Sequence, residues 1–164
     1  MDREQIALHI PRLRRYARAL VGDRYQSDDL VQDTLERALS KFHLWRSGSD
    51  LRAWLFAIMH NVFINQLKAR REYFLDEVTE SSLEAAPQAD MLEIRDLDTA
   101  LRRLTHEQRE VVLLVGLEQF SYAEASKALE IPVGTVMSRL SRGRERLRAL
   151  MSGSATVTNL KLVK

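Results

Sequence analysis

The spacing of apolar residues restricts this chain to an all-α fold. Over its 164 residues they recur every three or four positions, as on one face of an α-helix, and no run alternates with the period of a strand. The pattern predicts helices at about 3–21, 28–42, 51–71 and 97–104, one that begins after Thr105, one over 121–130 and a last one over 134–151.

Side chains that cap helix N-termini stand at four of these starts. Ser27 and Asp50 are predicted N-caps, and the two aspartates after Ser27 would then lie in the first turn, where the helix dipole favours anions. The sequences THEQ and SYAE, which begin at Thr105 and Ser121, have the spacing of a capping box. These caps set the expected boundaries between the helices.

Charge is segregated along the chain, although the formal net charge is only +2. Residues 72–98 hold nine acidic residues and one arginine, whereas 68–71 and 139–148 are basic. Acid-rich sequence without sustained apolar periodicity is typical of a linker. We therefore expect two small helical domains, 1–71 and 97–151, joined by an acidic flexible linker, 72–96, and followed by a frayed tail, 152–164.

Composition excludes several classes of protein. The chain has no cysteine, which excludes disulfides and thiolate metal sites and favours a reducing compartment. It has no stretch of about 18 apolar residues, so we expect a cytoplasmic protein without direct membrane insertion. The four histidines are scattered, and glycine-rich phosphate loops and serine elbows are missing, so we expect no metal, no cofactor, no catalytic residue and no enzyme activity. His60 is predicted to lie on the surface, opposite the apolar stripe of its helix.

The stretch SYAEASKALEIPVGTVMSRLSRGRERLRAL, 121–150, predicts a helix-turn-helix. A basic helix after a short connection fits the major groove of B-DNA, where arginines contact guanine edges and phosphates. A basic amphipathic helix alone is more often a solvated surface, and it is the pair of helices with this connection that favours DNA binding. The apolar stripe of the second helix consists of Val136, Leu140, Gly143, Leu147 and Leu150, and its other side carries hydroxyls and arginines.

The order of the motifs resembles a known family. The stretches DDLVQDTLERAL, DLRAWLFAIMHN, NQLKARR and LTHEQREVVLLVGLEQFSYAEASKALEIPVGTVMSRLSRGRERLR are similar to extracytoplasmic-function (group 4) sigma factors of bacterial RNA polymerase, in the sigma-70 family. The resemblance covers roughly residues 8–150. It implies that 1–71 is sigma domain 2, which binds core polymerase and the −10 element, and that 97–151 is sigma domain 4, which binds the −35 element.

The implied function is to direct core polymerase to specific promoters and to nucleate melting of the −10 element, in a stress or envelope response under anti-sigma control. The implied partners are core RNA polymerase, through its β′ clamp helices and β flap, promoter DNA and an anti-sigma factor. The helix DDLVQDTLERAL would dock on the clamp helices, and its implied polymerase-binding residues are Asp28, Asp29, Leu30, Gln32, Asp33 and Arg37.

The resemblance also assigns the −10 element to the third helix and the loop before it. An extruded base needs a stacking surface and hydrogen bonds, which Trp45 and Asn61 would supply. Without the resemblance, Trp45 is almost as well explained as a lid over the core, and Trp54 is expected in the core itself. Phosphates of the −10 element would be neutralised by Lys68, Arg70 and Arg71.

In the last helix, the resemblance implies contacts with the −35 element. The turn usually has glycine where Glu130 stands and alanine where Ser126 stands, so we expect Glu130 to adopt a left-handed backbone conformation or the turn to differ. Met137 replaces a residue that is often basic, so the base preference is expected to differ from that of relatives. The implied −35 residues are Thr135, Met137, Ser138, Arg139, Ser141, Arg142 and Arg146.

Two other functions fit parts of the sequence. An interaction protein that mimics a sigma factor and sequesters an anti-sigma partner would need the helical surface but not the DNA contacts, which are retained at Trp45, Asn61, Ser138 and Arg142. A helix-turn-helix repressor explains 105–150 but leaves the N-terminal half without a role.

Overall fold

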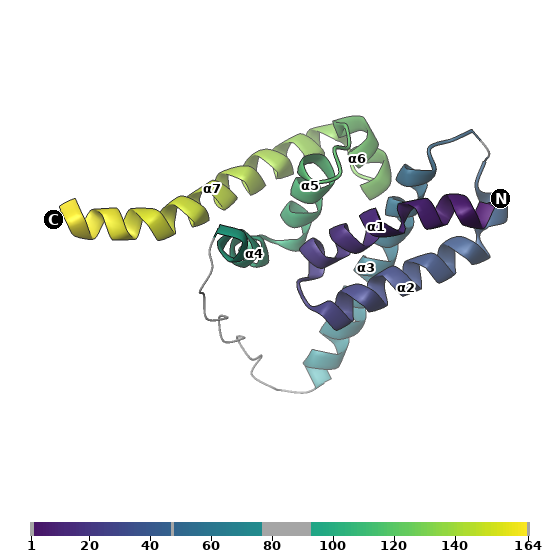
Figure 1. Cartoon of the computed structure of the whole chain (residues 1–164), viewed down its shortest axis with the longest axis horizontal. Helices are drawn as coiled ribbons and strands as arrows, with labels where there is room; N and C mark the ends of the chain where they lie inside the picture. Colours follow the sequence, from purple (N-terminus) through teal and green to yellow (C-terminus); the bar gives the residue numbers. More distant parts are fainter. Residues whose placement is uncertain (1, 47, 77–92, 164) are drawn as a thin grey trace.

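The computed structural model describes the backbone of residues 2–46, 48–76 and 93–163, and the side chains of 3–46, 48–73 and 96–152. Figure 1 shows helices throughout this part of the chain, as the all-α prediction requires. They are α1 (Asp2–Val21), α2 (Arg24–Ser40), the 3-10 helix η1 (Phe42–Leu44), α3 (Leu51–Asp76), α4 (Glu93–Arg103), α5 (His106–Gly116), α6 (Tyr122–Leu129) and α7 (Val133–Val163).

Helices α1, α2 and α3 form the N-terminal half around a common apolar core. Leu13, Leu20, Leu30, Leu55 and Met59 have no exposed surface, and each such side chain stabilises the fold by about 1.5–3 kcal/mol. These residues recur with helical spacing on all three helices, so the predicted stripes are the faces that meet.

The turn between α1 and α2 differs from the prediction. Gly22 ends α1 with a φ of +85°, which glycine adopts without strain, and Asp23 then caps α2 by accepting a hydrogen bond from the N–H of Gln26. The prediction of Ser27 as N-cap was wrong, because Asp23 is the first capping side chain after the glycine. Ser27 lies buried inside α2 and its hydroxyl donates to the carbonyl of Arg24.

Helices α4 to α7 form the C-terminal half. The capping boxes predicted at Thr105 and Ser121 are both present, at the N-termini of α5 and α6. Helix α7 packs across α4, α5 and α6, and it approaches α5 closely at Gly143. A Cβ at Gly143 would lie 2.8 Å from Cγ2 of Val112, so only glycine fits this crossing without a shift.

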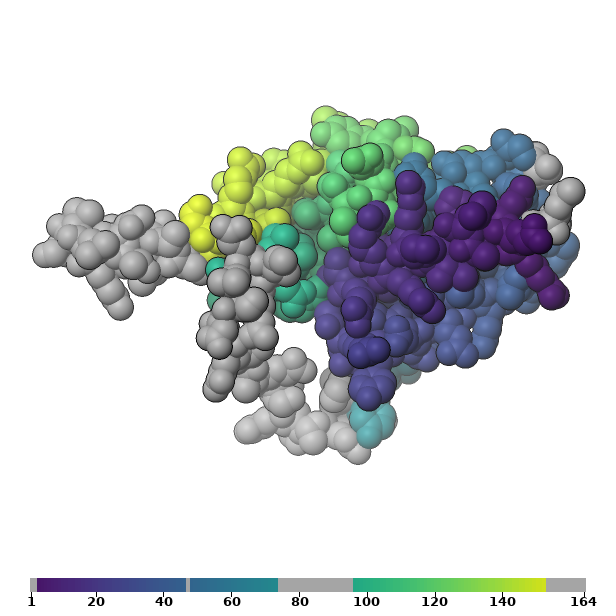
Figure 2. Space-filling view, viewed as in Figure 1, coloured from purple at the N-terminus to yellow at the C-terminus, as the bar shows by residue number. Residues whose placement is uncertain are grey.

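The two halves pack against each other and share one continuous core. The ring of Phe56 in α3 meets the edge of Phe120, before α6, with centroids 5.3 Å apart, and Phe56 also contacts Tyr16 of α1 at 5.1 Å. In Figure 2 the surfaces of α1 and of the α5–α6 region adjoin without a gap. The structure therefore describes two helical halves in direct contact.

Three helices extend beyond their predicted ends. Helix α3 continues to Asp76, α4 begins at Glu93, and α7 continues to Val163 through most of the stretch that was expected to be a frayed tail. None of these extensions contains proline, and adding a residue to an existing helix costs little compared with starting one. The predicted linker thus lies partly in α3 and α4, and its central part, 77–92, lies outside the described residues.

Candidate functional site

Helices α6 and α7 form the predicted helix-turn-helix, with Glu130 at its turn. Glu130 has φ 55° and ψ 46°, which confirms the expectation of a left-handed conformation. Val136 and Leu140 anchor the start of α7, because they are 0% and 2% exposed. The first four turns of α7 are therefore held on the domain by one side and present the other side to solvent.

The predicted −35 residues lie on this outer side of α7. Met137, Ser138, Ser141, Arg142 and Arg146 are exposed, whereas Thr135 and Arg139 are half-buried. Arg146 is partly engaged within the protein, since its Nε donates to the carbonyl of Arg103 at 3.3 Å. The outer side of α7 thus combines three arginines and three hydroxyls with the apolar side chain of Met137.

The predicted −10 residues lie along α3 and at its start. Asn61, Lys68 and Arg71 are exposed and Arg70 is half-buried. Asn61 and Lys68 are seven residues apart, so they lie on the same side of the helix, about 10 Å apart along its axis. This side of α3 combines an amide with cations.

Trp45 packs at the start of this surface. Its ring lies 5.3 Å from that of Phe42, which in turn meets the edge of Trp54 at 6.1 Å. The indole Nε1 of Trp45 is buried without a hydrogen-bond partner, which is unusual for a buried donor. Trp54 is half-buried and packs against the core, where it was predicted to lie.

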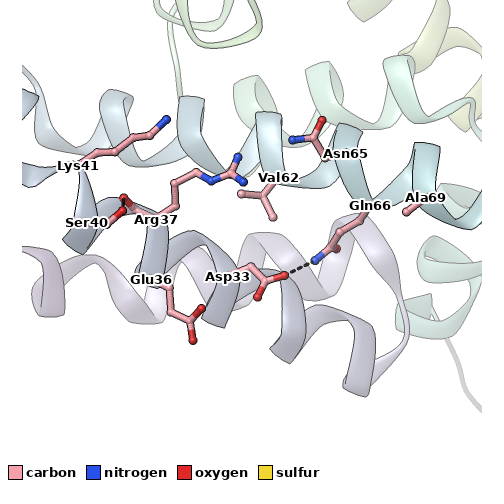
Figure 3. A pocket seen from close by; sticks show the side chains of 9 residues that line it. All are labelled: Asp33, Glu36, Arg37, Ser40, Lys41, Val62, Asn65, Gln66 and Ala69. Carbon is pink, nitrogen blue, oxygen red and sulfur yellow. Dashed lines mark hydrogen bonds between the residues drawn. The ribbon is translucent and has the colours of Figure 1, made fainter.

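Helix α2 is flanked by two grooves that contain the predicted polymerase-binding residues. Asp33 and Arg37 line a groove of about 570 Å³ between α2 and α3, together with Glu36, Lys41 and Asn65 (Figure 3). Figure 3 shows Gln66 reaching across this groove to donate to Asp33, at 2.9 Å. The groove thus offers both signs of charge to a partner.

The second groove lies between α1 and α2. Asp28 and Gln32 line it, with Arg14, Arg15, Arg18 and Arg24, in a volume of about 900 Å³. Leu30 was predicted to bind polymerase, but it is fully buried and supports α2 from inside. Of the six predicted residues, the other five lie on the outer surface of α2 or in its flanking grooves, and those are Asp28, Asp29, Gln32, Asp33 and Arg37.

Two arginines of the C-terminal half bind the end of α1. Arg102 donates to the carbonyl of Leu20 at 2.8 Å and to that of Ala19, and Arg109 donates to the carbonyl of Leu20 at 3.0 Å. Burial, and then the neighbouring charge of Arg102, lowers the pKa of Arg109 to about 10, so its guanidinium stays charged at neutral pH. These carbonyls have no partner within α1, and the two cations satisfy them.

A second group of contacts joins α1 and α3 to α5 and α6. The carboxylate of Glu118, 2% exposed, accepts from Arg15 at 3.1 Å, and Arg52 donates to the carbonyl of Glu118 at 2.9 Å and to Glu124 at 3.2 Å. Arg52 also lies 4.4 Å above the ring of Phe120. Nε of Arg102 and Oε1 of Glu118 are buried with no hydrogen-bond partner.

The prediction of His60 as a surface residue was wrong. Its Nδ1 contacts the carboxylate of Glu110, which is 3% exposed. The apolar stripe of α3 faces the N-terminal half, and His60 does lie on the opposite side of the helix. That opposite side is not exposed, because it faces α5. Burial, and then Glu110 and Glu118, raises the pKa of Tyr16 well above its ordinary value, so the Tyr16 hydroxyl stays neutral beside these acids.

The sequence contained a signal for these contacts. Glu110 and Glu118 stand among apolar residues in REVVLLVGLEQF, and Glu110 shares a helical face with Leu113 and Leu114. A carboxylate on an apolar face indicates a buried pair with a cation.

In the described residues no helix is long and apolar enough to cross a membrane, and no three His, Cys, Asp or Glu side chains converge as metal ligands.

Two family models match the chain, one for each half. Residues 6–60 match the model described as "Sigma2 domain of PhyR", and residues 94–147 match "Sigma-70, region 4". The first match covers α2 and the start of α3 but ends before Asn61, Lys68, Arg70 and Arg71, and the second covers the helix-turn-helix.

Similar proteins span both halves. The chain is 39% identical over 152 residues to the ECF RNA polymerase sigma factor EcfG of Rhodopseudomonas palustris (strain TIE-1). This match covers 91% of this chain and 84% of that protein. The structure superposes with a TM-score of 0.80 and 36% identity on the sigma factor RpoE from Bartonella quintana, solved in complex with the anti-sigma factor NepR, over 92% of this chain and 96% of that one. The anti-anti-sigma factor PhyR from the same organism shares the fold, at a TM-score of 0.62 and 21% identity, over 88% of this chain and 48% of that one. The chain belongs to the ECF sigma factors of bacterial RNA polymerase.

Proposed function

We propose that this chain acts as its family does: it binds core polymerase through α2, contacts the −10 element through α3 and contacts the −35 element through α7. The observation that carries this proposal is that the polar residues of all three surfaces are exposed or half-buried, on a scaffold whose apolar core positions are buried. Such a protein acts as an initiation factor and needs no catalytic group of its own.

Promoter binding requires the two halves to separate. Elements centred at −10 and −35 lie about 25 base pairs apart, which is about 85 Å of B-DNA at 3.4 Å per base pair. A compact body of 164 residues has a radius of gyration of about 15 Å, so the packed halves are too close together to reach both elements. We infer that core polymerase binds the separated form and holds the halves apart.

We also propose control by an anti-sigma factor that binds the packed form. The superposition with the NepR-bound sigma factor extends over 92% of this chain, so it includes both halves in one arrangement. A partner that binds only the packed form shifts the population away from the promoter-binding form.

A sigma mimic that binds only an anti-sigma partner is the competing function, since the N-terminal half matches the Sigma2 model of PhyR. The exposed amide of Asn61 and the exposed Arg142 favour a protein that contacts DNA. Transcription with the purified chain and core polymerase on a genomic fragment library separates the two. A sigma factor yields defined start sites that depend on the chain, a mimic yields none, and a repressor protects DNA without polymerase.

Separation of the halves has its own measurement. Small-angle X-ray scattering of the free chain should give a compact particle, and distances between dyes on α2 and α7 should lengthen when core polymerase is added. An unchanged distance in an active holoenzyme would show that the halves stay packed.

A further inference from the structure

The turn of the helix-turn-helix holds a glutamate in a conformation that suits glycine. Glu130 has a φ of 55°, where the Cβ of any residue other than glycine crowds the backbone. The strain favours other turn geometries unless contacts within the turn offset it.

Ser126 supplies those contacts. Its carbonyl accepts from the N–H groups of Glu130 and Ile131, the latter at 3.1 Å, and its hydroxyl donates to the carbonyl of Ile131 at 2.5 Å. One half-buried residue in α6 therefore binds three polar backbone groups of the turn.

The hydrogen bond from the Ser126 hydroxyl to the carbonyl of Ile131 holds the peptide that leads directly into α7. The hydrogen bonds of α7 begin at the carbonyl of Pro132, which accepts from Thr135 at 3.0 Å and from Val136 at 3.1 Å. The carbonyl of Ile131 lies one residue before this ladder, and Pro132 has no N–H of its own. Ser126 is thus the link between the end of α6 and the start of α7.

We propose that Ser126 is a positioning residue for DNA recognition: its hydroxyl sets where α7 begins and so places Met137 and Ser138 against the bases. This rests on the proposed −35 function. Met137 and Ser138 lie within two turns of the tethered peptide and are exposed, with Met137 at 50%. They follow the buried anchor Val136 directly, whereas Arg142 and Arg146 lie further on, beyond the second buried anchor, Leu140.

The position of the tether predicts which part of recognition depends on it. Without the hydroxyl, the start of α7 samples several orientations, and binding must select one of them. A hydrogen bond of ordinary strength corresponds to roughly a fivefold loss of affinity. The preference at bases read by the start of α7 should relax, whereas the salt dependence set by arginine–phosphate contacts should not change.

The experiment uses the full chain bound to core polymerase and a double-stranded DNA pool with a randomised upstream element. Wild type, Ser126→Ala, Ser126→Thr and the double variant Ser126→Ala/Glu130→Gly are compared by sequencing the bound DNA, by affinity for the wild-type-selected site, and by thermal unfolding. Ser126→Ala should relax the base preference and weaken binding roughly fivefold. Ser126→Thr, which keeps the hydroxyl, should restore both.

The double variant separates positioning from stability. Glycine at 130 removes the backbone strain but does not restore the tether, so unfolding should return toward wild type while the base preference stays relaxed. The double variant also tests the positioning role of Ser126 if Ser126→Ala alone does not fold. Wild-type preference and affinity in the folded Ser126→Ala chain, or wild-type preference in the double variant, would overturn the positioning role and leave the −35 function intact. A wild-type holoenzyme that enriches no sequence would overturn the −35 function, and the positioning role with it.

Discussion

Arg102 in α4 donates a hydrogen bond of 2.8 Å to the carbonyl of Leu20, in the last turn of α1. The bond links residues 82 positions apart and joins the two halves of the molecule at the C-terminus of a helix. Carbonyls at such a terminus have no partner within the helix and carry a partial negative charge, so they attract a cation. The C-terminal half thus binds the N-terminal half at the end of α1.

Gly22, next to this contact, should be intolerant of any side chain. Its φ is +85°, and a Cβ would lie 2.9 Å from the guanidinium of Arg102. Gly22→Ala should lower the free energy of unfolding through backbone strain of about 1–2 kcal/mol and through displacement of Arg102. Gly48→Ala is the matched control, because Gly48 has a φ of +96° with no atom nearby and suffers the strain alone. Equal losses in urea unfolding would show that the Arg102 contact contributes nothing.

Gly143 should be required for the crossing of α7 over α5. Gly143→Ala places a methyl 2.8 Å from Cγ2 of Val112 and should destabilise the chain by about 1–3 kcal/mol, despite the better helix propensity of alanine. Gly134→Ala, in open space on the same helix, should be neutral or stabilising. The double variant Gly143→Ala/Val112→Ala removes the Val112 methyl groups that crowd position 143 and should recover part of the lost stability. Thermal unfolding reports all three variants.

Asn61→Ala should impair promoter opening. Its amide is exposed on α3, where it would bind an extruded base, and removing it leaves the polymerase surface on α2 unchanged. We expect a reduced yield of open complex, measured by permanganate reactivity of the −10 region, with unchanged binding of core polymerase. Equal loss of both would contradict the assignment.

Arg142→Ala should weaken −35 binding by about 1–3 kcal/mol if Arg142 contacts a base, or reduce the salt slope of binding by about one if it contacts phosphate. Arg144→Ala is the matched control, because Arg144 is also exposed on α7 but points about 200° away. Both are measured by fluorescence anisotropy of the holoenzyme on promoter DNA. Indistinguishable affinities would remove Arg142 from the site.

Acid should loosen the contact between α3 and α6. The N–H of Ser121, and also Arg52, stabilises the ionised Glu124 and lowers its pKa. A lowered folded pKa gives stability that is present above the unfolded pKa, 4.5, and is lost as pH falls through the folded value. Unfolding free energy of the wild type should therefore fall below pH 4.5 more steeply than that of Glu124→Gln, in paired urea titrations. Parallel curves would exclude Glu124 from the acid response.

Features fixed by neighbouring residues could be predicted from the sequence. The capping boxes at Thr105 and Ser121 depend only on residues within one turn, so their patterns were sufficient. The left-handed Glu130 was expected only through the family resemblance, as one of two alternatives. The failure at Ser27 has the same origin, because two capping side chains competed and the chain used the one beside Gly22.

The contact between the halves could not be predicted in the same way. An apolar stripe shows which face of a helix packs against one neighbour, but α3 has neighbours on two sides. His60 therefore contacts Glu110 of α5 although it lies opposite the apolar stripe. Arg52, Arg102 and Arg109 look like ordinary surface cations in sequence, because their acceptors are mainly backbone carbonyls of distant residues.

Two atoms in the contact between the halves, Nε of Arg102 and Oε1 of Glu118, lack a hydrogen-bond partner. Each regains a water molecule when the halves part, and this hydration returns part of the free energy lost on their burial. The packed arrangement is therefore less stable than its apolar contacts alone would make it. If core polymerase separates the halves as proposed, the hydration that these two atoms recover lowers the docking energy that it must supply.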